Sequence, residues 1–327
     1  MVRSTTLNGR RGLLIENQYL PRSLHVFIFF YTDDQLMKFI SFLFFVLAAY
    51  PISVLPFRVL YVLSDILYFN ITYIFRYRRK VILQNLANAF PDMSDGERKV
   101  IMKKYYKNLS DVTLENVKML TISRSEVLKR CKIVNQSMFD SYEKDGKSII
   151  AVSSHYCNWE LGGFSIALNA NHQLLAAYLP LSNKYFDNLV NKMRKKFGAI
   201  LVEPERIARA MVEHKENLTI SVYIADQAPL HSDQAYWTTF LNQDTPVFTG
   251  PEKIAKLVDS PVVYLYMQRI KRGYYTIEVI AINDKPRETE ENETTEKQLR
   301  VLENIIKERP ENWLWSHKRW KRKRTAG

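Results

Sequence analysis

The chain has 327 residues, 46% of them hydrophobic, which is enough to bury a substantial core in one large domain or two small ones. Lys and Arg outnumber Asp and Glu by 47 to 34, and the formal net charge of +13 indicates a polyanionic partner: nucleic acid, an anionic membrane surface, or an acidic substrate or carrier. Two cysteines and six scattered histidines give neither a disulfide framework nor metal-ligand spacing, so no metal site is predicted.

The first 80 residues divide into a leading segment and an apolar stretch. Residues 1–36 show no sustained hydrophobic period, and we expect them to be a non-native or disordered extension, with translation starting at Met37. Residues 39–57 carry no charge and are long enough to span a bilayer, which takes about 20 apolar residues. Pro51, Pro56 and the amphipathic run 58–75 also allow a helical hairpin in one leaflet. We predict a membrane anchor over 37–80, followed by a cytoplasmic domain, because the basic cluster RYRRK closes it.

Two other interpretations of the apolar stretch fit less well. A cleaved signal peptide is disfavoured because no small-residue cleavage site follows. A buried core helix of a soluble protein is disfavoured because the run is nearly all apolar.

Residues 81–327 are predicted to form one α/β domain with a basic C-terminal tail. Helical patterns fill 80–145, where Ser94 and Glu97 have the spacing of a capping box. Strands and helices then alternate, which predicts a mixed, largely parallel sheet flanked by helices. The expected strands are 148–153, 174–179, 199–202, 218–225 and an antiparallel hairpin of 262–269 with 274–282; the expected helices are 157–170, 183–197, 205–215, 251–258 and 294–308.

The segment SIIAVSSHYCNWELGGFSIAL, residues 148–168, places His155 and Glu160 on a strand-to-helix turn. On one continuous helix the two side chains would diverge by roughly 140°, but a turn lets Glu160 reach back to the imidazole. A histidine that is oriented by a carboxylate can act as a general base. A capping pair without chemistry explains the spacing about equally well. Cys157 adjoins the motif, and we expect it to be a packed free thiol rather than a nucleophile.

Six ordered blocks of the sequence then resemble one family. HYCNWE resembles the H-x-x-x-x-(D/E) motif of the lauroyl and myristoyl acyltransferases of lipid A biosynthesis, a branch of the lysophospholipid acyltransferase superfamily. The other blocks are YRRKVILQNLANAFP, LPLSNKYFDNLVNKMRKKFGA, YIADQ, WTTFLNQDTPVFTGPEKIAKL and NWLWSHKRWKRK, and the last two look most like Bacteroidetes-type members. The resemblance covers roughly residues 37–324 and implies a glycerolipid acyltransferase-like fold.

The resemblance implies a membrane-bound enzyme that moves a fatty acyl chain from an acyl-carrier-protein thioester to a hydroxyl of a lipid A precursor. His155 would be the general base and Glu160 would orient it, while Arg194 would hold a phosphate. Asp226 and Gln227 end a predicted strand that points to the crevice of His155; Asp226 could anchor a loop, bind acceptor hydroxyls or orient His155. Asn158 is grouped with the substrate-binding residues, although a structural hydrogen bond in the turn is favoured over catalysis.

The resemblance implies no cofactor, with acyl carrier protein as donor in preference to acyl-CoA, and an inner-membrane location facing the cytoplasm. The aromatic and cationic tail SHKRWKRKR fits nucleic acid or an anionic membrane, and beside an apolar anchor the membrane is favoured, with no nucleic acid expected. Two alternatives stay open: a lysophospholipid or aminolipid acceptor, and a non-catalytic basic membrane-binding protein. A hydrolase and a nucleotide enzyme are disfavoured because the chain has no G-x-S-x-G, P-loop or G-x-G-x-x-G motif.

Overall fold

The computed structural model divides the chain into two units, Met1–Ser41 and Phe42–Gly327. It describes residues 4–7, 10–13, 33–229 and 235–324. The first unit holds a two-stranded antiparallel hairpin, β1 (Ser4–Leu7) and β2 (Arg10–Leu13), and the beginning of α1 (Asp33–Val54). Much of the extension predicted over 1–36 therefore lies outside the described residues.

Two apolar helices precede the α/β domain. Helix α1 is followed by α2 (Phe57–Phe69), which begins after Pro56 and continues into a π-helical turn, Asn70–Ile74. The segments Gln35–Val54 and Phe57–Ile74 are each long and apolar enough to cross a membrane. Only 11% and 17% of these segments are buried, which is not the behaviour of core helices. These helices are consistent with a membrane-associated protein.

Helices α3 (Arg79–Ala89) and α4 (Asp95–Lys118) connect this region to the sheet. Helix α4 begins at the predicted capping box: the Ser94 hydroxyl accepts a hydrogen bond from the Glu97 amide, and the Glu97 carboxylate accepts one from the Ser94 amide. Helix α4 packs along α2 and α3 and carries buried polar side chains towards the domain. It is followed by α5 (Arg124–Arg130), β3 (Cys131–Ile133) and α6 (Ser137–Lys144).

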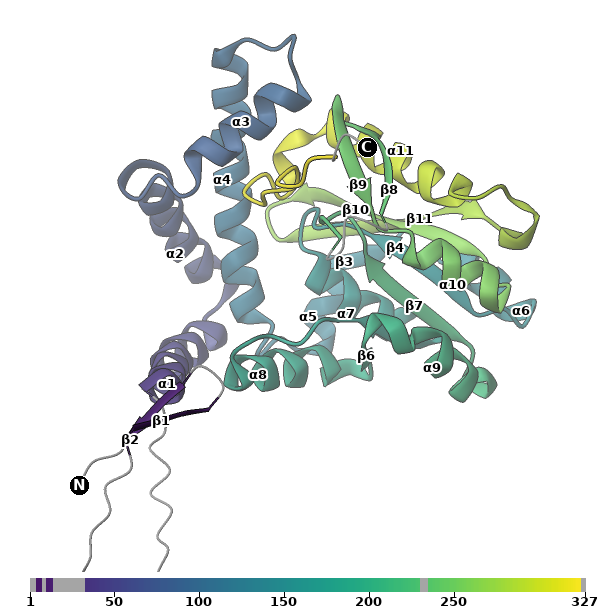
Figure 1. Cartoon of the computed structure of the whole chain (residues 1–327), viewed down its shortest axis with the longest axis horizontal. Coiled ribbons are helices and arrows are strands. Elements are labelled where there is room, and N and C mark those ends of the chain that lie inside the picture. The colour runs from purple at the N-terminus through teal and green to yellow at the C-terminus, as the bar shows by residue number, and fades with distance from the viewer. Residues whose placement is uncertain (1–3, 8–9, 14–32, 230–234, 325–327) are drawn as a thin grey trace, which may run out of the picture. The chain divides into compact units, whose positions relative to one another are not determined.

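The centre of the domain is a seven-stranded sheet in the order β3-β11-β10-β4-β7-β5-β6 (Figure 1). Neighbours pair in parallel except β10 and β11, which form the predicted antiparallel hairpin. This confirms the mixed, largely parallel sheet. The strands are β4 (Ile149–Ser153), β5 (Gln173–Ala177), β6 (Ile200–Val202), β7 (Thr219–Ile224), β10 (Val262–Lys271) and β11 (Tyr274–Asn283).

Helices cover both faces of this sheet. On one face, α10 (Gly250–Val258) contacts both α9 (Ile207–Glu213) and α11 (Glu293–Glu308), and all three contact strands of the sheet. On the other face, α7 (Trp159–Asn169) contacts both α5 and α8 (Lys184–Arg194) (Figure 1). A second hairpin, β8 (Tyr236–Phe240) with β9 (Gln243–Val247), was not predicted. The closing segment after α11 packs against this hairpin through Trp313 and Trp320, whose rings contact Phe240.

Candidate active site

The register of two adjacent parallel strands brings His155 and Asp226 together. Strand β4 ends at Ser153 and β7 ends at Ile224, and these two residues are direct partners in the sheet. His155 and Asp226 each follow two residues later, at the carboxyl ends where ligands collect in such sheets. One Asp226 oxygen lies 2.7 Å from His155 Nδ1, and the other accepts hydrogen bonds from the His155 amide (3.1 Å) and Trp313 Nε1 (2.8 Å).

These contacts keep Asp226 ionised and select the tautomer of His155. Burial raises the pKa of Asp226, but the charge of His155 and hydrogen bonds from His155 and Trp313 outweigh it, so its pKa lies below the ordinary value. An ionised carboxylate only accepts, so Nδ1 carries the proton of the neutral imidazole and Nε2 is unprotonated, with a lone pair that accepts hydrogen bonds. The Gln227 amide nitrogen lies 3.1 Å from this Nε2 and donates to it. The imidazole is thus oriented as a base, with its side chain 19% exposed.

The expected pairing of Glu160 with His155 is wrong in this structure. The Glu160 carboxylate binds Arg194 instead, with Nε at 3.1 and 2.9 Å from its two oxygens and a further contact from Nη2. The reason is the start of α7: Trp159 occupies the helix position facing the imidazole, with ring centroids 4.8 Å apart. Glu160 lies about 100° further around the helix, towards α8. The carboxylate on the imidazole is Asp226, the third of the roles considered for that residue.

Arg194 binds the Glu160 carboxylate through Nε and Nη2. Burial lowers the pKa of Arg194, but the hydrogen bond and charge of Glu160 raise it by more, so its pKa lies above the ordinary value. The two side chains are 31% and 14% exposed, so the pair lies at the edge of the site. Arg194 and Glu160, predicted to act in separate roles, form one unit.

Asn158 is completely buried, which corrects its grouping with substrate-binding residues. Its side-chain oxygen caps α7 by accepting from the Leu161 amide at 3.0 Å, and its amide nitrogen donates to Glu115 at 2.8 Å. Cys157 lies beside it in the left-handed region, with φ of 55°, and its amide donates to the Asn312 carbonyl. Burial raises the pKa of the Cys157 thiol, so no thiolate nucleophile is available.

The closing segment contributes residues that the sequence did not assign to the site. Trp313 holds Asp226, as described above. Arg319 is 1% exposed; its Nη2 donates to the Pro246 carbonyl, while Nε and Nη1 have no partner among the described residues. Burial lowers the pKa of Arg319 to about 10, against the opposing effect of Asp226. Only the clustering of Trp and Arg in NWLWSHKRW could have signalled this contribution.

A small apolar cavity of about 30 Å³ lies between α7 and strands β4, β7, β10 and β11. Its lining includes Trp159 and Gly163 of α7, Ile224 of β7 and Met267 of β10. A Cβ atom at Gly163 would meet nothing within 4 Å, so the helix surface is open at that position. Ser153 and Ile224, the last residues of β4 and β7, also line it, so the cavity reaches the strand ends that precede His155 and Asp226.

Comparison with known proteins identifies the family of the chain. Residues 32–322 match the family described as bacterial lipid A biosynthesis acyltransferase. A lipid A biosynthesis acyltransferase of Haemophilus influenzae is 24% identical over 246 residues, which is 75% of this chain and 78% of that protein. The lipid A biosynthesis palmitoleoyltransferase and lauroyltransferase of Escherichia coli are each 20% identical over 75% of this chain and 79% of their own length. The chain belongs to the bacterial lipid A biosynthesis acyltransferase family.

Proposed function

We propose that the protein transfers a fatty acyl chain from an acyl-carrier-protein thioester to a hydroxyl of a lipid A precursor, with His155 as the general base. The observation that carries the proposal is the hydrogen bond between His155 and Asp226, at the carboxyl ends of two parallel strands. It leaves the Nε2 lone pair facing away from Asp226 in a partly exposed position. Family membership supplies the lipid A chemistry.

The reaction needs no covalent enzyme intermediate. The acceptor hydroxyl gives its proton to His155 Nε2 as its oxygen attacks the thioester carbonyl carbon, and a new C–O bond forms. When the intermediate collapses, the C–S bond breaks and the imidazolium returns the proton to the departing sulfur. The products are an ester and a free carrier thiol, and such general-base assistance contributes about 10²–10⁴-fold.

Each neighbour of the imidazole has a defined part in this proposal. Asp226 stabilises the imidazolium, because its carboxylate is buried and 2.7 Å from Nδ1. Gln227 gives up its contact with Nε2 when the acceptor hydroxyl arrives. The Glu160–Arg194 pair presents the remaining guanidinium nitrogen, Nη1, to a phosphate of the acceptor or of the carrier's phosphopantetheine arm.

The surroundings support a membrane enzyme. The acyl chain lies against the apolar lining of the cavity beside Trp159 and Gly163. The exposed apolar residues of α1 and α2 hold the protein at the inner membrane, with the active site on the cytoplasmic side. The net charge of +13 favours both an anionic membrane and an acidic carrier protein.

The test is lipid mass spectrometry combined with an assay of purified protein. Cells lacking the gene should lose one acyl chain from lipid A, and wild-type protein should restore it while His155→Ala should not. In detergent, the protein should acylate a lipid A precursor from acyl carrier protein, and substitution of acyl-CoA should slow transfer. Unchanged lipid A together with an altered phospholipid or aminolipid would instead support the other acceptors. Restoration by His155→Ala would exclude the general base.

A further inference from the structure

A buried carboxylate, Glu115 of α4, lies beneath the turn that carries the candidate base. It is 3% exposed and accepts three hydrogen bonds from neutral side chains. Oε2 accepts from Asn158 Nδ2 at 2.8 Å and from the Tyr275 hydroxyl at 2.7 Å, and Oε1 accepts from the Tyr61 hydroxyl at 2.9 Å. A carboxylate so far from water is expensive to bury, so each of these donors counts.

The bond from Asn158 links Glu115 to the start of α7. The Asn158 oxygen caps the helix through the Leu161 amide, and its nitrogen binds Glu115, so both ends of one planar amide are occupied. This amide lies between His155, three residues earlier, and Glu160, two residues later. Glu115 is the partner of the Asn158 amide nitrogen among the described residues, so its loss would leave the amide plane without support on that side.

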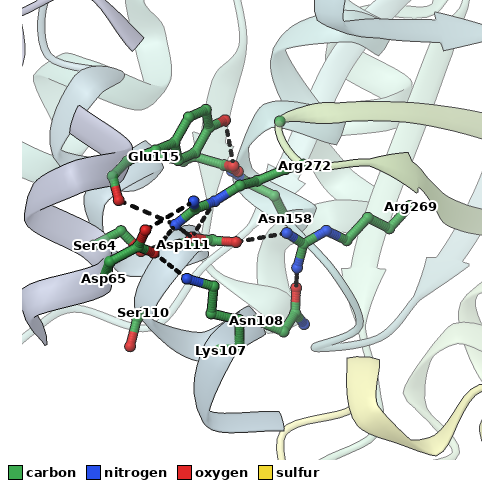
Figure 2. A network of polar contacts seen from close by, with 12 residues as sticks. Ser64, Asp65, Lys107, Asn108, Ser110, Asp111, Glu115, Asn158, Arg269 and Arg272 are labelled. Atoms are coloured by element: carbon green, nitrogen blue, oxygen red, sulfur yellow. Dashed lines mark hydrogen bonds and ion pairs between the residues drawn. The ribbon is translucent and has the colours of Figure 1, made fainter. Parts of the chain in front are cut away.

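An ion-pair network centred on Asp111 lies on the same helix as Glu115 (Figure 2). One turn earlier, the completely buried Asp111 accepts from Arg269 Nη2 at 2.5 Å, from Arg272 Nε at 2.9 Å and from the Ser64 hydroxyl at 2.6 Å. Arg272 also pairs with Asp65 of α2. The network therefore joins α4 to α2 and to the turn between β10 and β11, which fixes the backbone from which Glu115 projects.

We propose that Glu115 is a positioning residue: through the amide of Asn158 it fixes the turn on which His155 and Glu160 sit, and it does not touch the substrate. The proposal rests on the proposed function for its kinetic consequence. A displacement of about 1 Å in such a turn can cost about 10²-fold in rate. The link to Tyr61 extends the same support to α2.

The kinetic test compares three variants that differ in what they leave bound to Asn158. Glu115→Met keeps the length of the side chain but accepts no strong hydrogen bond, and should lower kcat about 10- to 100-fold with little change in KM. Glu115→Gln should retain kcat within about threefold, because its oxygen can face Asn158 and Tyr275 while its nitrogen faces the Tyr61 hydroxyl. Tyr275→Phe is the matched control: it removes a buried bond to Glu115 but leaves Asn158 attached, and should keep kcat.

A double-mutant cycle separates positioning from loss of stability. Asn158→Ala should lower kcat, and adding Glu115→Met should lower it no further, because Glu115 acts only through that amide. Independent, multiplying losses would overturn the proposal, as would full kcat in folded Glu115→Met or an equal loss in Tyr275→Phe. If Glu115→Met does not fold, Asn158→Asp serves instead: it retains the cap on Leu161, removes the donor to Glu115, and should also lower kcat.

Hydrogen exchange gives a readout that does not depend on the reaction. The Leu161 amide donates to Asn158, so it should exchange faster in Glu115→Met than in wild type and stay unchanged in Tyr275→Phe. Wild type and His155→Ala are assayed alongside. Absent transfer by wild type, or full transfer by His155→Ala, would defeat the proposed function. Unchanged exchange at Leu161 in Glu115→Met would defeat the positioning of the turn.

Discussion

The carboxylate of Asp226 accepts hydrogen bonds from three N–H groups. The positions of these donors decide how an Asn side chain would be oriented in its place. One oxygen faces His155 Nδ1; the other accepts from the His155 backbone amide and from Trp313 Nε1. Two of these donors have fixed protons. The third, on the imidazole, stays on Nδ1 only because the residue opposite is a pure acceptor.

Asp226→Asn should therefore lower kcat by about 10²–10⁴-fold with the fold preserved. The two fixed donors take the amide oxygen, which turns the amide nitrogen towards the imidazole and moves the ring proton to Nε2. A histidine in that tautomer cannot accept the proton of the acceptor hydroxyl. The measurement is steady-state acyl transfer by purified protein, with thermal unfolding as the check on folding.

Trp313→Phe is the control for this substitution, because it keeps an aromatic ring in the core and removes only one of the donors to Asp226. It leaves the carboxylate and the tautomer intact, so kcat should fall less than in Asp226→Asn. A near-normal kcat in Asp226→Asn would mean that the tautomer of His155 is irrelevant, and the general-base assignment would fail.

At the level of elements, strands and helices with a regular hydrophobic pattern could be predicted from the sequence. Contacts that depend on the direction of a side chain could not. The strand from 148 to 153 and the hairpin of 262–269 with 274–282 were predicted because apolar runs and alternation are local signals, and the structure confirms both. The hairpin of β8 and β9 was missed because its sequence, YWTTFLNQDTPV, has a proline in the second strand and no regular alternation.

The partner of His155 was predicted incorrectly for a similar reason. Strand-end position put Asp226 and Gln227 in the same crevice as the imidazole, and the structure brings all three together. Choosing between Asp226 and Glu160 requires the register of β4 with β7 and the first turn of α7, and neither is visible in one sequence. Glu115 gave no signal at all, since its role depends on contacts with residues 54, 43 and 160 positions away.

The buried Glu115 of α4 should make the stability of the protein depend on pH. Burial raises the pKa of Glu115 above its ordinary value near 4.5, although hydrogen bonds from Asn158, Tyr275 and Tyr61 oppose the shift. The folded protein thus holds the proton more tightly than the unfolded chain, so this group's contribution to stability is complete below pH about 4.5 and is lost as pH rises through the raised pKa.

Glu115→Gln removes that titration and keeps the hydrogen bonds. The unfolding free energy of Glu115→Gln relative to wild type should therefore rise between pH about 4.5 and the native pKa of Glu115, then level off. Urea unfolding in detergent at a series of pH values, with the denaturant slope checked for constancy, measures this difference. A difference that stays constant across the range would show that Glu115 does not titrate in this window.

Over the whole molecule, the proposed membrane attachment has two separable sources, apolar exposure and positive charge. The first resides in α1 and α2, where Phe44 is 70% and Leu47 is 63% exposed, with Val62 at 59% on the second helix. Side chains of this size gain about 1.5–3 kcal/mol each when removed from water, and salt does not screen that gain. The second is the net charge of +13, whose attraction to anionic lipid falls as ionic strength rises.

Replacement of Phe44 and Leu47 by lysine should therefore shift much of the protein from the membrane pellet to the soluble fraction in high salt. Wild type should remain in the pellet until detergent is added. The matched control is Leu257→Lys on α10, which is also 67% exposed but lies on the α/β domain, and it should stay with the membrane. Because the lysines add charge as well as removing apolar surface, the double variant should retain some binding to anionic vesicles at low salt. Release of wild type by salt alone would assign the attachment to charge and leave the exposed faces of α1 and α2 without a membrane role.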